Sequence, residues 1–460
     1  MNGRRLQLGL LALLLGGCAS MAPPYERPAA PVGASFPDPA PAATSTPPAA
    51  DIEWQQFFTD PRLKALIALA LQNNRDLRTA VLNIERVRAQ YQIQRAEAFP
   101  TLLLGATGLF QPNADGRGNH SAYTAGFTVT GYELDLFGRV RSLSDAALQQ
   151  YFASEEARKA AQISLIAAVA NSYLTLLADD AQLAAAQQTL ATREQSYRLL
   201  KLKFDNGALS EYDLAQGVTL VEGARAALAL LQRQRMQNQN ALVLLVGQPL
   251  PAGLPAALPV EASAGLAELP VGLPSEVLLR RPDVRQAEQQ LIAAHFNIGA
   301  ARAAFFPRIT LTGSAGVASG HLSDLFKSGH AAWSFAPQLI QPLFDAGRNQ
   351  GNLDLAKANR DIAVAQYERA IQSAFREVAD ALAGRATLGD QLNAQRKQLE
   401  AEQARSRLVE LCWRNGAASS LELLDAQRSL FAAQQALLQL QAQSTQNLAT
   451  LYKVLGGGWK

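Results

Sequence analysis

Cysteine is almost absent from this chain: only Cys18 and Cys412 occur among 460 residues, which excludes a disulfide framework. The four histidines are scattered without the spacing of metal ligands. The sequence also lacks a CxxC pair, an HExxH motif, a phosphate-binding loop and a glycine-rich nucleotide fingerprint. We therefore expect a protein that is not an enzyme and that needs neither a metal nor a bound cofactor.

Charge of one sign is also lacking. The 42 Lys and Arg residues nearly balance the 39 Asp and Glu residues, so the net charge is +3. No dense basic cluster occurs, and we expect no nucleic-acid partner. Aromatic residues make up only 7% of the chain, whereas Ala, Leu and Gln are frequent, which is typical of long helices.

Long apolar runs are missing after the N-terminus. No unbroken run of 18 or more apolar residues follows Cys18, so we expect any membrane crossing to be made by β-strands. Residues 6–15 form one apolar run that is too short to span a bilayer, and Arg4 and Arg5 precede it. This pattern predicts a signal peptide over residues 1–17.

The end of that run carries a second signal. Leu15-Gly16-Gly17-Cys18 resembles the bacterial lipobox, which implies cleavage before Cys18, a diacylglycerol on its thiol and a palmitoyl chain on its new amine. Such chains anchor a protein stably, and Ala19 favours sorting to the outer membrane. An ordinary signal peptide with a chance Cys is the alternative. Residues 18–60 are then a lipidated, Pro-rich N-terminal segment, and we expect residues 19–50 within it to be an extended tether or wrap.

The remaining chain contains two copies of one plan. Motifs recur at a spacing of 207 to 209 residues. The matched pairs are residues 74–80 with 281–287, 98–100 with 305–307, 137–139 with 346–348, and 204–207 with 413–416. We therefore predict a first repeat over residues 61–250, a connection over residues 251–282 and a second repeat over residues 283–460.

Each copy begins with a helix and continues with two β segments. The helices are expected over residues 72–98 and 283–305, and the strands over residues 101–110, 123–131, 308–317 and 333–341. The strands alternate apolar and polar residues, as expected for one face in lipid and one in water. Four strands in two isolated hairpins cannot close a barrel, so closure needs several copies of the chain. A trimer would supply twelve strands, and the sequence alone does not exclude a dimer with eight.

Two very long helices follow the strands. Residues 139–205 and 348–414 contain no Pro, and each stretch of 67 residues would form about 100 Å of helix. Asn206-Gly207 and Asn415-Gly416 end them, with Gly suited to the left-handed position of a helix C-cap. Return helices are expected over residues 211–246 and 419–455. The pattern predicts antiparallel helical hairpins that continue a β-barrel.

These stretches resemble a known family, the TolC-like outer membrane factors, and specifically the lipoprotein subgroup of multidrug efflux pumps of the resistance–nodulation–division (RND) type. The matching stretches are Trp54-x-x-Phe57-Phe58-x-Asp60-Pro61-x-Leu63, Asn74-x-Asp76-Leu77, and residues 132–139 (YELDLFGR), 280–283 (RRPD), 299–307 (GAARAAFFP) and 423–430 (LLDAQRSL). The resemblance covers essentially the whole chain after Cys18.

The resemblance implies an α+β membrane protein. It implies a homotrimer with a 12-stranded β-barrel in the outer membrane, a long α-helical barrel in the periplasm and a mixed equatorial domain. The partners it implies are a periplasmic adaptor protein and an inner-membrane RND transporter, and the cargo is a range of drugs. The same channel serving type I protein secretion or metal-ion efflux is an alternative. A further alternative is a coiled-coil spacer anchored by its lipid, but the alternation in the β segments argues against it.

The resemblance also places a periplasmic gate at the hairpin ends. Glu422 and Asp425 are spaced i, i+3 at the start of a return helix, and Asp213 is the first-repeat equivalent of Glu422. In a trimer each acid would form a ring of three like charges, which repel one another and favour cations. The alternative is that these acids only complement the helix dipole. The adaptor-contact positions implied are Asn206, Gly207, Arg414, Asn415 and Gly416.

The latch of the hairpin ends departs from the family pattern. Some members close this end with an aromatic residue three positions before the Gly and a basic residue two positions after it. Here Trp413 supplies the aromatic residue, but Ala418 stands in place of the base, so Arg414 is a candidate partner. We expect Leu421 to pack in the core rather than to plug the bore, and Cys412 to be a small buried hydrophobe.

Overall fold

The computed structural model describes residues 20–37, 49–112, 118–259 and 275–459. The predicted signal peptide and Cys18 lie outside the described residues, as does much of the tether. The chain divides into two compact units, each assembled from three stretches of sequence. Unit 1 comprises Met1–Ala30, Leu82–Glu156 and Arg285–Arg369, and unit 2 comprises Pro31–Val81, Ala157–Val284 and Ala370–Lys460.

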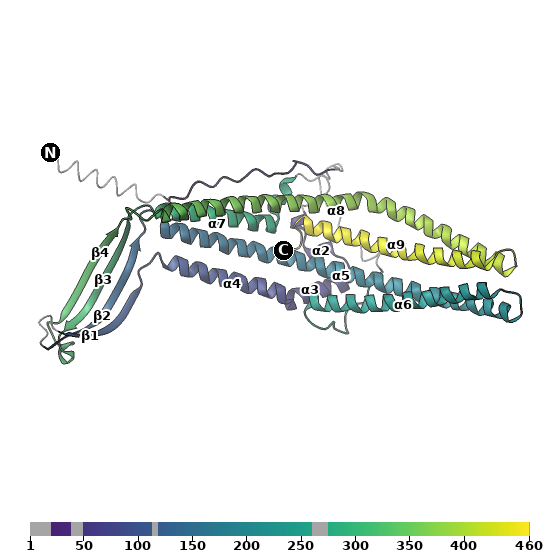
Figure 1. Cartoon of the computed structure of the whole chain (residues 1–460), viewed down its shortest axis with the longest axis horizontal. Helices are drawn as coiled ribbons and strands as arrows, with labels where there is room; N and C mark the ends of the chain where they lie inside the picture. The colour runs from purple at the N-terminus through teal and green to yellow at the C-terminus, as the bar shows by residue number, and fades with distance from the viewer. Residues whose placement is uncertain (1–19, 38–48, 113–117, 260–274, 460) are drawn as a thin grey trace. The chain divides into compact units, whose positions relative to one another are not determined.

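The order of elements repeats, as the sequence predicts (Figure 1). The first repeat contains α3 (Pro61–Asn73), α4 (Arg75–Ala96), β1 (Leu102–Pro112), β2 (Asn119–Leu134), α5 (Arg139–Asp205) and α6 (Glu211–Val246). The second contains η3 (Ser275–Arg280), α7 (Pro282–Ala303), β3 (Arg308–Ser319), η4 (Leu322–Asp324), β4 (Ala331–Ile340), α8 (Arg348–Arg414) and α9 (Ser420–Val454). The expected mixture of long helices and four strands is confirmed.

The helix expected over residues 72–98 is α4, which begins at Arg75, and a separate helix, α3, precedes it and ends at Asn73. Asn74 has an extended backbone, and its side-chain oxygen accepts a hydrogen bond from the backbone N–H of Leu77 at 2.9 Å. An Asn that caps the following helix in this way competes with helix continuation. The preceding helix α3 was not among the predicted elements.

The four strands form one antiparallel sheet in the order β1-β2-β3-β4. The expectation of two isolated hairpins is therefore wrong, because β2 of the first repeat pairs directly with β3 of the second. That pairing is irregular between Val129 and Tyr132, where Gly131 has a φ of 65°. An extra residue of this kind bends a strand and increases its twist.

The two faces of the sheet differ as the alternation predicts. The register places Leu104 beside Phe127, Phe127 beside Ala315, and Ala315 beside Trp333, all on one apolar face. The other face carries hydroxyl pairs. One of them joins Thr107 Oγ1 to Thr124 Oγ1 at 2.6 Å. Every residue of β1 and β4 is exposed in the chain, and neither strand has a second pairing partner among the described residues.

The two central strands approach each other unusually closely. Gly126 and Gly316 face one another in the register of β2 and β3. A Cβ on Gly316 would lie 2.1 Å from the backbone oxygen of Ala125, and one on Gly126 would lie 2.5 Å from that of Ala315. No side chain fits at either position without moving a strand, so glycine permits the local curvature.

Unit 2 has an aromatic core built from the first motif of the family pattern. Phe57 and Phe58 are fully buried, and the ring of Phe57 stacks on that of Tyr452 at 3.9 Å between centroids. Asp60 caps α3 and also accepts a hydrogen bond from the Tyr173 hydroxyl at 2.8 Å. Burial beside this carboxylate raises the pKa of Tyr173, so the hydroxyl stays protonated as the donor.

The described part of the N-terminal segment behaves as a wrap. Residues 20–37 form no helix or strand, apart from an isolated bridge at Ser35. In unit 1, Tyr25 and Arg27 both donate to the Glu288 carboxylate on α7, at 3.1 and 2.6 Å. In unit 2, Ser275 donates its N–H to the backbone oxygen of Ala34 at 3.0 Å. This bridge and the short helices η2 (Ala49–Asp51), α2 (Trp54–Phe57) and η3 are what the described residues show of the expected mixed equatorial domain.

Two helices, α5 and α6, are long and apolar enough to cross a membrane by length and composition alone. In α5, 56% of the most apolar window is buried within the chain, as in the core helix of a protein, whereas the figure for α6 is 22%. The mean hydropathy of a window can be high even when Gln, Ser or Thr interrupt it. Both helices are interrupted in this way, so neither contains an unbroken apolar run. The expectation that strands make the membrane crossing therefore depends on the sheet and not on hydropathy.

Candidate functional site at the hairpin ends

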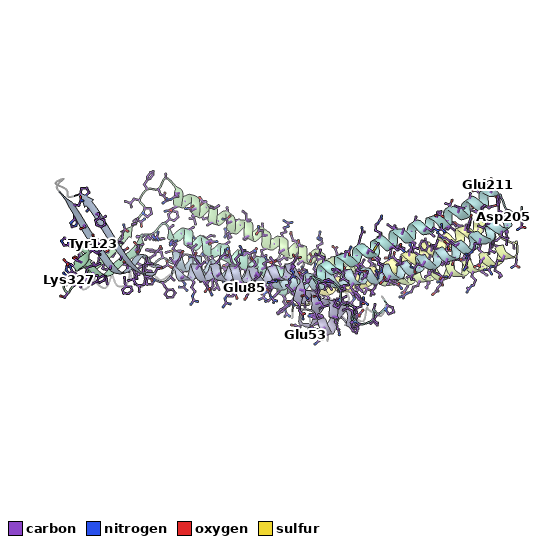
Figure 2. The ribbon with its side chains drawn as sticks, turned by 90° about the horizontal axis from the view of Figure 1, so that it is seen from below. Glu53, Glu85, Tyr123, Asp205, Glu211 and Lys327 are labelled. Carbon is purple, nitrogen blue, oxygen red and sulfur yellow. The ribbon has the colours of Figure 1, made fainter. Side chains whose placement is uncertain are left out.

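Both helical hairpins end in the same backbone motif. Gly207 and Gly416 have φ values of 71° and 78°. The N–H of Ala208 donates to the oxygen of Lys203 at 2.8 Å, and the N–H of Ala417 donates to that of Cys412 at the same distance. These bonds satisfy the last carbonyls of α5 and α8, as a left-handed Gly does at a helix end. The predicted helix ends are confirmed, and Asp205 and Glu211 flank the first of these turns (Figure 2).

The side chains of the two tip asparagines are already engaged. Asn206 Nδ2 donates to the oxygen of Leu202 at 2.7 Å, and Asn415 Nδ2 donates to that of Leu411 at 2.8 Å. Each amide thus satisfies a carbonyl of its own helix end. A partner that binds this end of the chain therefore meets mainly backbone and small residues at the turns.

Two of the three predicted gate acids cap helices. Ser419 and Glu422 form a capping box at the start of α9, with the Ser419 N–H donating to Glu422 Oε2 at 2.7 Å. Asp213 makes a similar arrangement with Ser210 at the start of α6. The backbone hydrogen bond from Ser419 lowers the pKa of Glu422, so this carboxylate is charged at neutral pH. No Lys or Arg in the described part of the chain pairs with it.

The third gate acid has a different environment. Asp425 accepts hydrogen bonds from Arg405 on α8 at 2.5 Å and from Arg428 on α9 at 2.7 Å. The hydrogen bond from Arg405, followed by Arg428, lowers the pKa of Asp425. Because this pKa is depressed, the pairing contributes at neutral pH and is lost only as the pH falls through the lowered value. The sequence predicts a bare acidic ring here, whereas the chain supplies two cations to one acid.

Trp413, the aromatic residue of the predicted latch, is buried between the two hairpins. Its side chain is only 4% exposed and packs in a cluster with Leu200, Leu423 and Leu424, which brings together residues of both hairpins. The ammonium of Lys203, on α5, lies 4.0 Å from the centroid of the indole ring, and the indole N–H donates to Ser420 Oγ at 3.3 Å. A cation over an aromatic face is attracted to it. Lys203, on the other hairpin, supplies the positive charge that Ala418 cannot.

Three expectations about neighbouring residues are corrected. Arg414 pairs with Glu410, one turn earlier on its own helix, rather than with a residue of the other hairpin. Leu421 is 58% exposed and does not pack in the core. Cys412 is exposed rather than buried, because its neighbour Trp413 takes the inward position on that turn.

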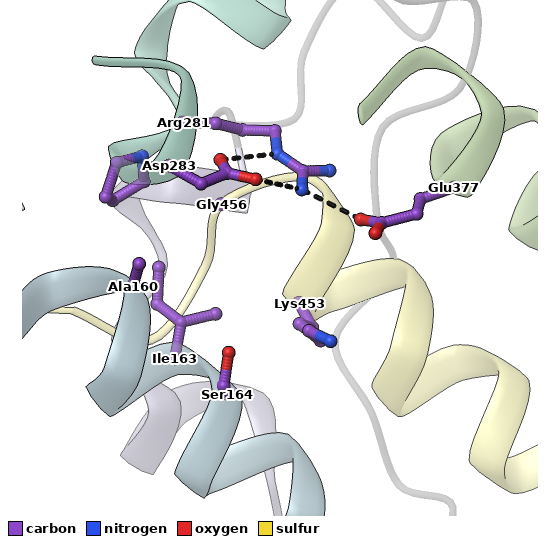
Figure 3. Close-up of a pocket in the computed structure, with 9 residues that line it drawn as sticks. Ala160, Ile163, Ser164, Arg281, Asp283, Glu377, Lys453 and Gly456 are labelled. Atoms are coloured by element: carbon purple, nitrogen blue, oxygen red, sulfur yellow. Dashed lines mark hydrogen bonds and ion pairs between the residues drawn. The ribbon is translucent and has the colours of Figure 1, made fainter. Parts of the chain in front are cut away.

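A buried ionic cluster of unit 2 lies around Arg281, directly before α7 (Figure 3). Its buried guanidinium pairs with Asp283 at 2.7 Å and with Glu377 at 2.8 Å, and it donates to the backbone oxygen of Val454 at 2.9 Å. The group lines a pocket of about 160 Å³ together with Lys453 and seven further residues. It joins the beginning of the second repeat to the end of α9 and to α8.

The first repeat contains the equivalent bond. Asn74 Nδ2 donates to the backbone oxygen of Leu245 at 2.9 Å. Asn74 matches Arg281 at the repeat spacing of 207, and Leu245 matches Val454 at the spacing of 209. Each repeat is therefore closed by one side chain at its start and one carbonyl at its end. Only the second closure carries an ion pair, so we call it the ionic clasp, defined by Arg281, Asp283, Glu377 and the Val454 carbonyl.

The ionic clasp gives a stability prediction. Arg281→Met should destabilise the protein by about 2 kcal/mol, less than the 3–5 kcal/mol of fully buried pairs, because Asp283 and Glu377 are 44% and 37% exposed. Thermal unfolding followed by circular dichroism would measure the loss. Arg280→Met is the matched control, since this neighbouring side chain is 64% exposed and should change little. Equal effects of the two substitutions would contradict a clasp at Arg281.

Comparisons with known proteins identify the family of the chain. The sequence model described as outer membrane efflux protein matches residues 66–248 and 273–457, which is most of the chain and one match for each repeat. The chain belongs to the outer membrane efflux protein family.

Members of this efflux family resemble the chain over nearly its whole length. The toluene efflux pump outer membrane protein TtgC of Pseudomonas putida is 47% identical, covering 99% of this chain and 95% of that protein. The outer membrane protein OprJ of Pseudomonas aeruginosa is 46% identical, covering 98% and 95%. The open-state structure of the MtrE outer membrane channel of Neisseria gonorrhoeae superimposes with a TM-score of 0.89 at 44% identity, covering 96% and 99%. The efflux-family fold and the outer-membrane location are thus established.

The family match makes this chain a transport protein. Within residues 20–37, 49–112, 118–259 and 275–459, no group of three or more His, Cys, Asp or Glu side chains could hold a metal ion. The groups that the structure does bring together are the acids, arginines and Trp413 at the hairpin ends. These are the candidate gate of the efflux protein.

The gate assignment predicts a shift away from cation selectivity when either Glu422 or Asp425 is neutralised. Glu422→Gln should lower cation selectivity, because it removes an unpaired negative charge. Asp425→Asn should shift selectivity further towards anions, because Arg405 and Arg428 lose their shared carboxylate. Reversal potentials of single channels in a salt gradient would measure both changes. Glu211→Gln, at an exposed acid of the other hairpin, is the control, and unchanged selectivity in both gate variants would refute the assignment.

Proposed function

We propose that this chain is the outer-membrane channel of a tripartite multidrug efflux system of the RND type. It would conduct drugs from an inner-membrane transporter and a periplasmic adaptor protein to the outside. The observation that carries the proposal is the sheet of unit 1, whose apolar face and two edges are uncovered in the single chain. Relatives named for antibiotic, toluene and solvent efflux support small apolar compounds as cargo.

Assembly into a homotrimer is part of the proposal. A strand edge in lipid leaves backbone N–H and C=O groups without partners, and each such group costs several kcal/mol. Pairing β4 of one copy with β1 of the next would remove both edges. Three copies would supply twelve strands, enough to enclose a channel, and would place the hydroxyl face inside and the apolar face in lipid.

Lipidation of Cys18 is also proposed. The contacts of the nearby described residues support it, because they fix the chain along α7. The backbone oxygen of Met21 accepts from Arg302 at 3.3 Å, and Ala22 lies so close to Gly299 that a Cβ there would meet its N at 2.7 Å. Arg302 is in the last turn of α7, just before β3. Met21 and Ala22 are thereby held beside the end of α7 that leads into the proposed membrane-crossing strands, which is where an anchor would be expected.

The proposed partners meet the chain at the hairpin ends. The channel has no energy source of its own, so an adaptor that binds the open form more tightly than the closed form would have to shift the equilibrium. The tips defined by Asn206, Gly207, Arg414, Asn415 and Gly416 are the proposed adaptor contacts. Their exposure on short turns supports this, because a partner can reach them without disturbing either hairpin.

Accumulation of dyes and antibiotics in cells tests the proposal. Deletion of the gene should raise accumulation several-fold, and restoration of the intact gene should reverse it. A version with Cys18→Ser would test the lipid anchor separately. Unchanged accumulation, with an intact outer-membrane barrier and no redundant channel, would contradict multidrug efflux. In that case, loss of a secreted protein or of metal-ion tolerance would indicate protein secretion or metal-ion export through the same channel.

A further inference from the structure

A cavity of about 200 Å³ lies between the two helical hairpins of unit 2, and none of the candidate gate side chains lines it. Its walls include Thr189 and Arg193 of α5, Ser406 of α8, and Gln427 and Phe431 of α9. Arg193 stands 12 residues before the end of α5, which corresponds to roughly 18 Å of helix. The gate and the ionic clasp use none of these side chains.

The guanidinium of Arg193 is buried without a carboxylate partner. The residue is 6% exposed, and its Nη1 donates to the backbone oxygen of Leu220 at 3.1 Å. The group lies 5.4 Å from the centroid of the Phe431 ring, and its Nε has no hydrogen-bond partner among the described residues. Burial lowers the pKa of Arg193, and no acid of the described chain offsets that effect. An Arg nevertheless stays charged in a protein, so this positive charge lacks a counter-charge.

The other groups around the cavity do not supply one. Glu410 is on the wall, but its carboxylate pairs with Arg414. Gln427 is 8% exposed; its amide nitrogen donates to Ser196 at 2.8 Å, while its oxygen is unpartnered. A buried charge without compensation is costly, and proteins normally pair such a charge or bind an ion to it.

We propose that this cavity binds a small anion, such as inorganic phosphate or a halide, held by the Arg193 guanidinium with the hydroxyls of Thr189 and Ser406 as further donors. The planar guanidinium can donate two parallel hydrogen bonds to phosphate, and its charge also attracts a halide. The volume exceeds that of one water, about 30 Å³, several times, which leaves room for an anion with some of its hydration.

The position of the cavity means that a bound anion would affect how the two hairpins pack together. Its walls come from both hairpins, so a bound anion would hold α5 to α8 and α9. If the chain is the proposed channel, anions would favour the closed arrangement of the hairpin ends. This consequence rests on the proposed function, whereas anion binding itself does not, so accumulation in cells and binding to the purified protein test them separately.

Thermal unfolding of the purified full-length chain with added inorganic phosphate tests the site. Ionic strength is held constant with lactobionate, which is too bulky for the cavity. We expect the wild-type Tm to rise with each tenfold increase in phosphate, because a ligand that binds only the folded state stabilises it. Arg193→Gln should abolish this rise, whereas Arg198→Gln, at an exposed Arg of the same helix, should retain it.

Two outcomes would overturn the proposal. One is a wild-type Tm that does not depend on phosphate. The other is an Arg193→Gln variant whose Tm is lowered equally at every phosphate concentration while the dependence is kept, since that would indicate a purely structural role. Crystals of the wild-type chain soaked in bromide provide a measurement that needs no variant. Anomalous density beside Arg193 supports the site, and density only at other places refutes it.

Discussion

Trp413→Ala is expected to leave the channel leaky. The substitution removes the largest side chain of the cluster that joins the two hairpins, and it removes the ring under the Lys203 ammonium. Truncation of a buried Trp costs about 3–5 kcal/mol in a protein core. Here that loss falls on the contact between the hairpins, so a closed channel should open more than a hundredfold more often. In planar bilayers we expect larger and longer openings. In cells we expect sensitivity to antibiotics that are too large to cross the intact outer membrane.

Graded variants separate the parts of this contact. Trp413→Phe keeps an aromatic face but loses the N–H bond to Ser420, and it should leave the channel largely closed. Lys203→Met keeps the apolar stem and removes the charge, which is worth about 0.5–2 kcal/mol over a ring. It should therefore have an intermediate effect. A Trp413→Ala protein that reaches the membrane in normal amount and conducts like the wild type would show that closure depends on other residues.

Gly316→Val is expected to prevent assembly. The nearest atoms to a new Cβ are backbone atoms of β2, the Ala125 oxygen at 2.1 Å and the Gly126 Cα at 2.6 Å. Backbone atoms cannot rotate away as a side chain can, so β2 and β3 would have to separate, at a cost of about 3 kcal/mol or more. That separation would split the sheet at the seam between the two repeats. Little protein should migrate as a trimer on gels without heating, and little should reach the outer membrane.

Gly313→Ala is the matched control on the same strand. Its Cβ would meet only the Ser334 oxygen at 3.5 Å and the Phe335 ring at 3.8 Å, which are ordinary contacts. This variant should assemble normally. Normal assembly of Gly316→Val as well would mean that the close approach of the strands has no structural role.

Local signals made much of the fold predictable. The helix ends at Asn206-Gly207 and Asn415-Gly416 were predictable because glycine adopts the left-handed conformation of a helix C-cap more readily than other residues. The long helices that precede these ends contain no Pro that would interrupt them. The strands followed from alternation of side chains, which is also local. Pairing of β2 with β3 could not be predicted in the same way. Alternation tells which residues share a face, but it does not tell which strand lies alongside.

The candidate site was predictable in position but not in its contacts. Glu422 and Asp425 were picked out by spacing, yet their environments differ because of groups outside that spacing. Arg405 reaches Asp425 from 20 residues away on the opposite helix, which depends on how α8 and α9 are aligned. The same applies to Lys203, whose place over Trp413 depends on the packing of two hairpins that are about 200 residues apart in sequence. Periodicity also did not predict that Cys412 is exposed, because the next residue on the helix, Trp413, is buried and the two positions differ by only one step along the helix.

The uncovered edges of β1 and β4 make the stability of the sheet a matter of mass action. In the proposed trimer, β1 and β4 each pair along one edge within the chain and along the other edge with another copy. Folding of these strands is therefore coupled to the concentration of the chain. Dilution in detergent should lower the unfolding temperature of the strands before that of the helices. A newly made chain also exposes two templates for unwanted strand addition until it meets its partners, which makes the interval between secretion and assembly the period of greatest aggregation risk.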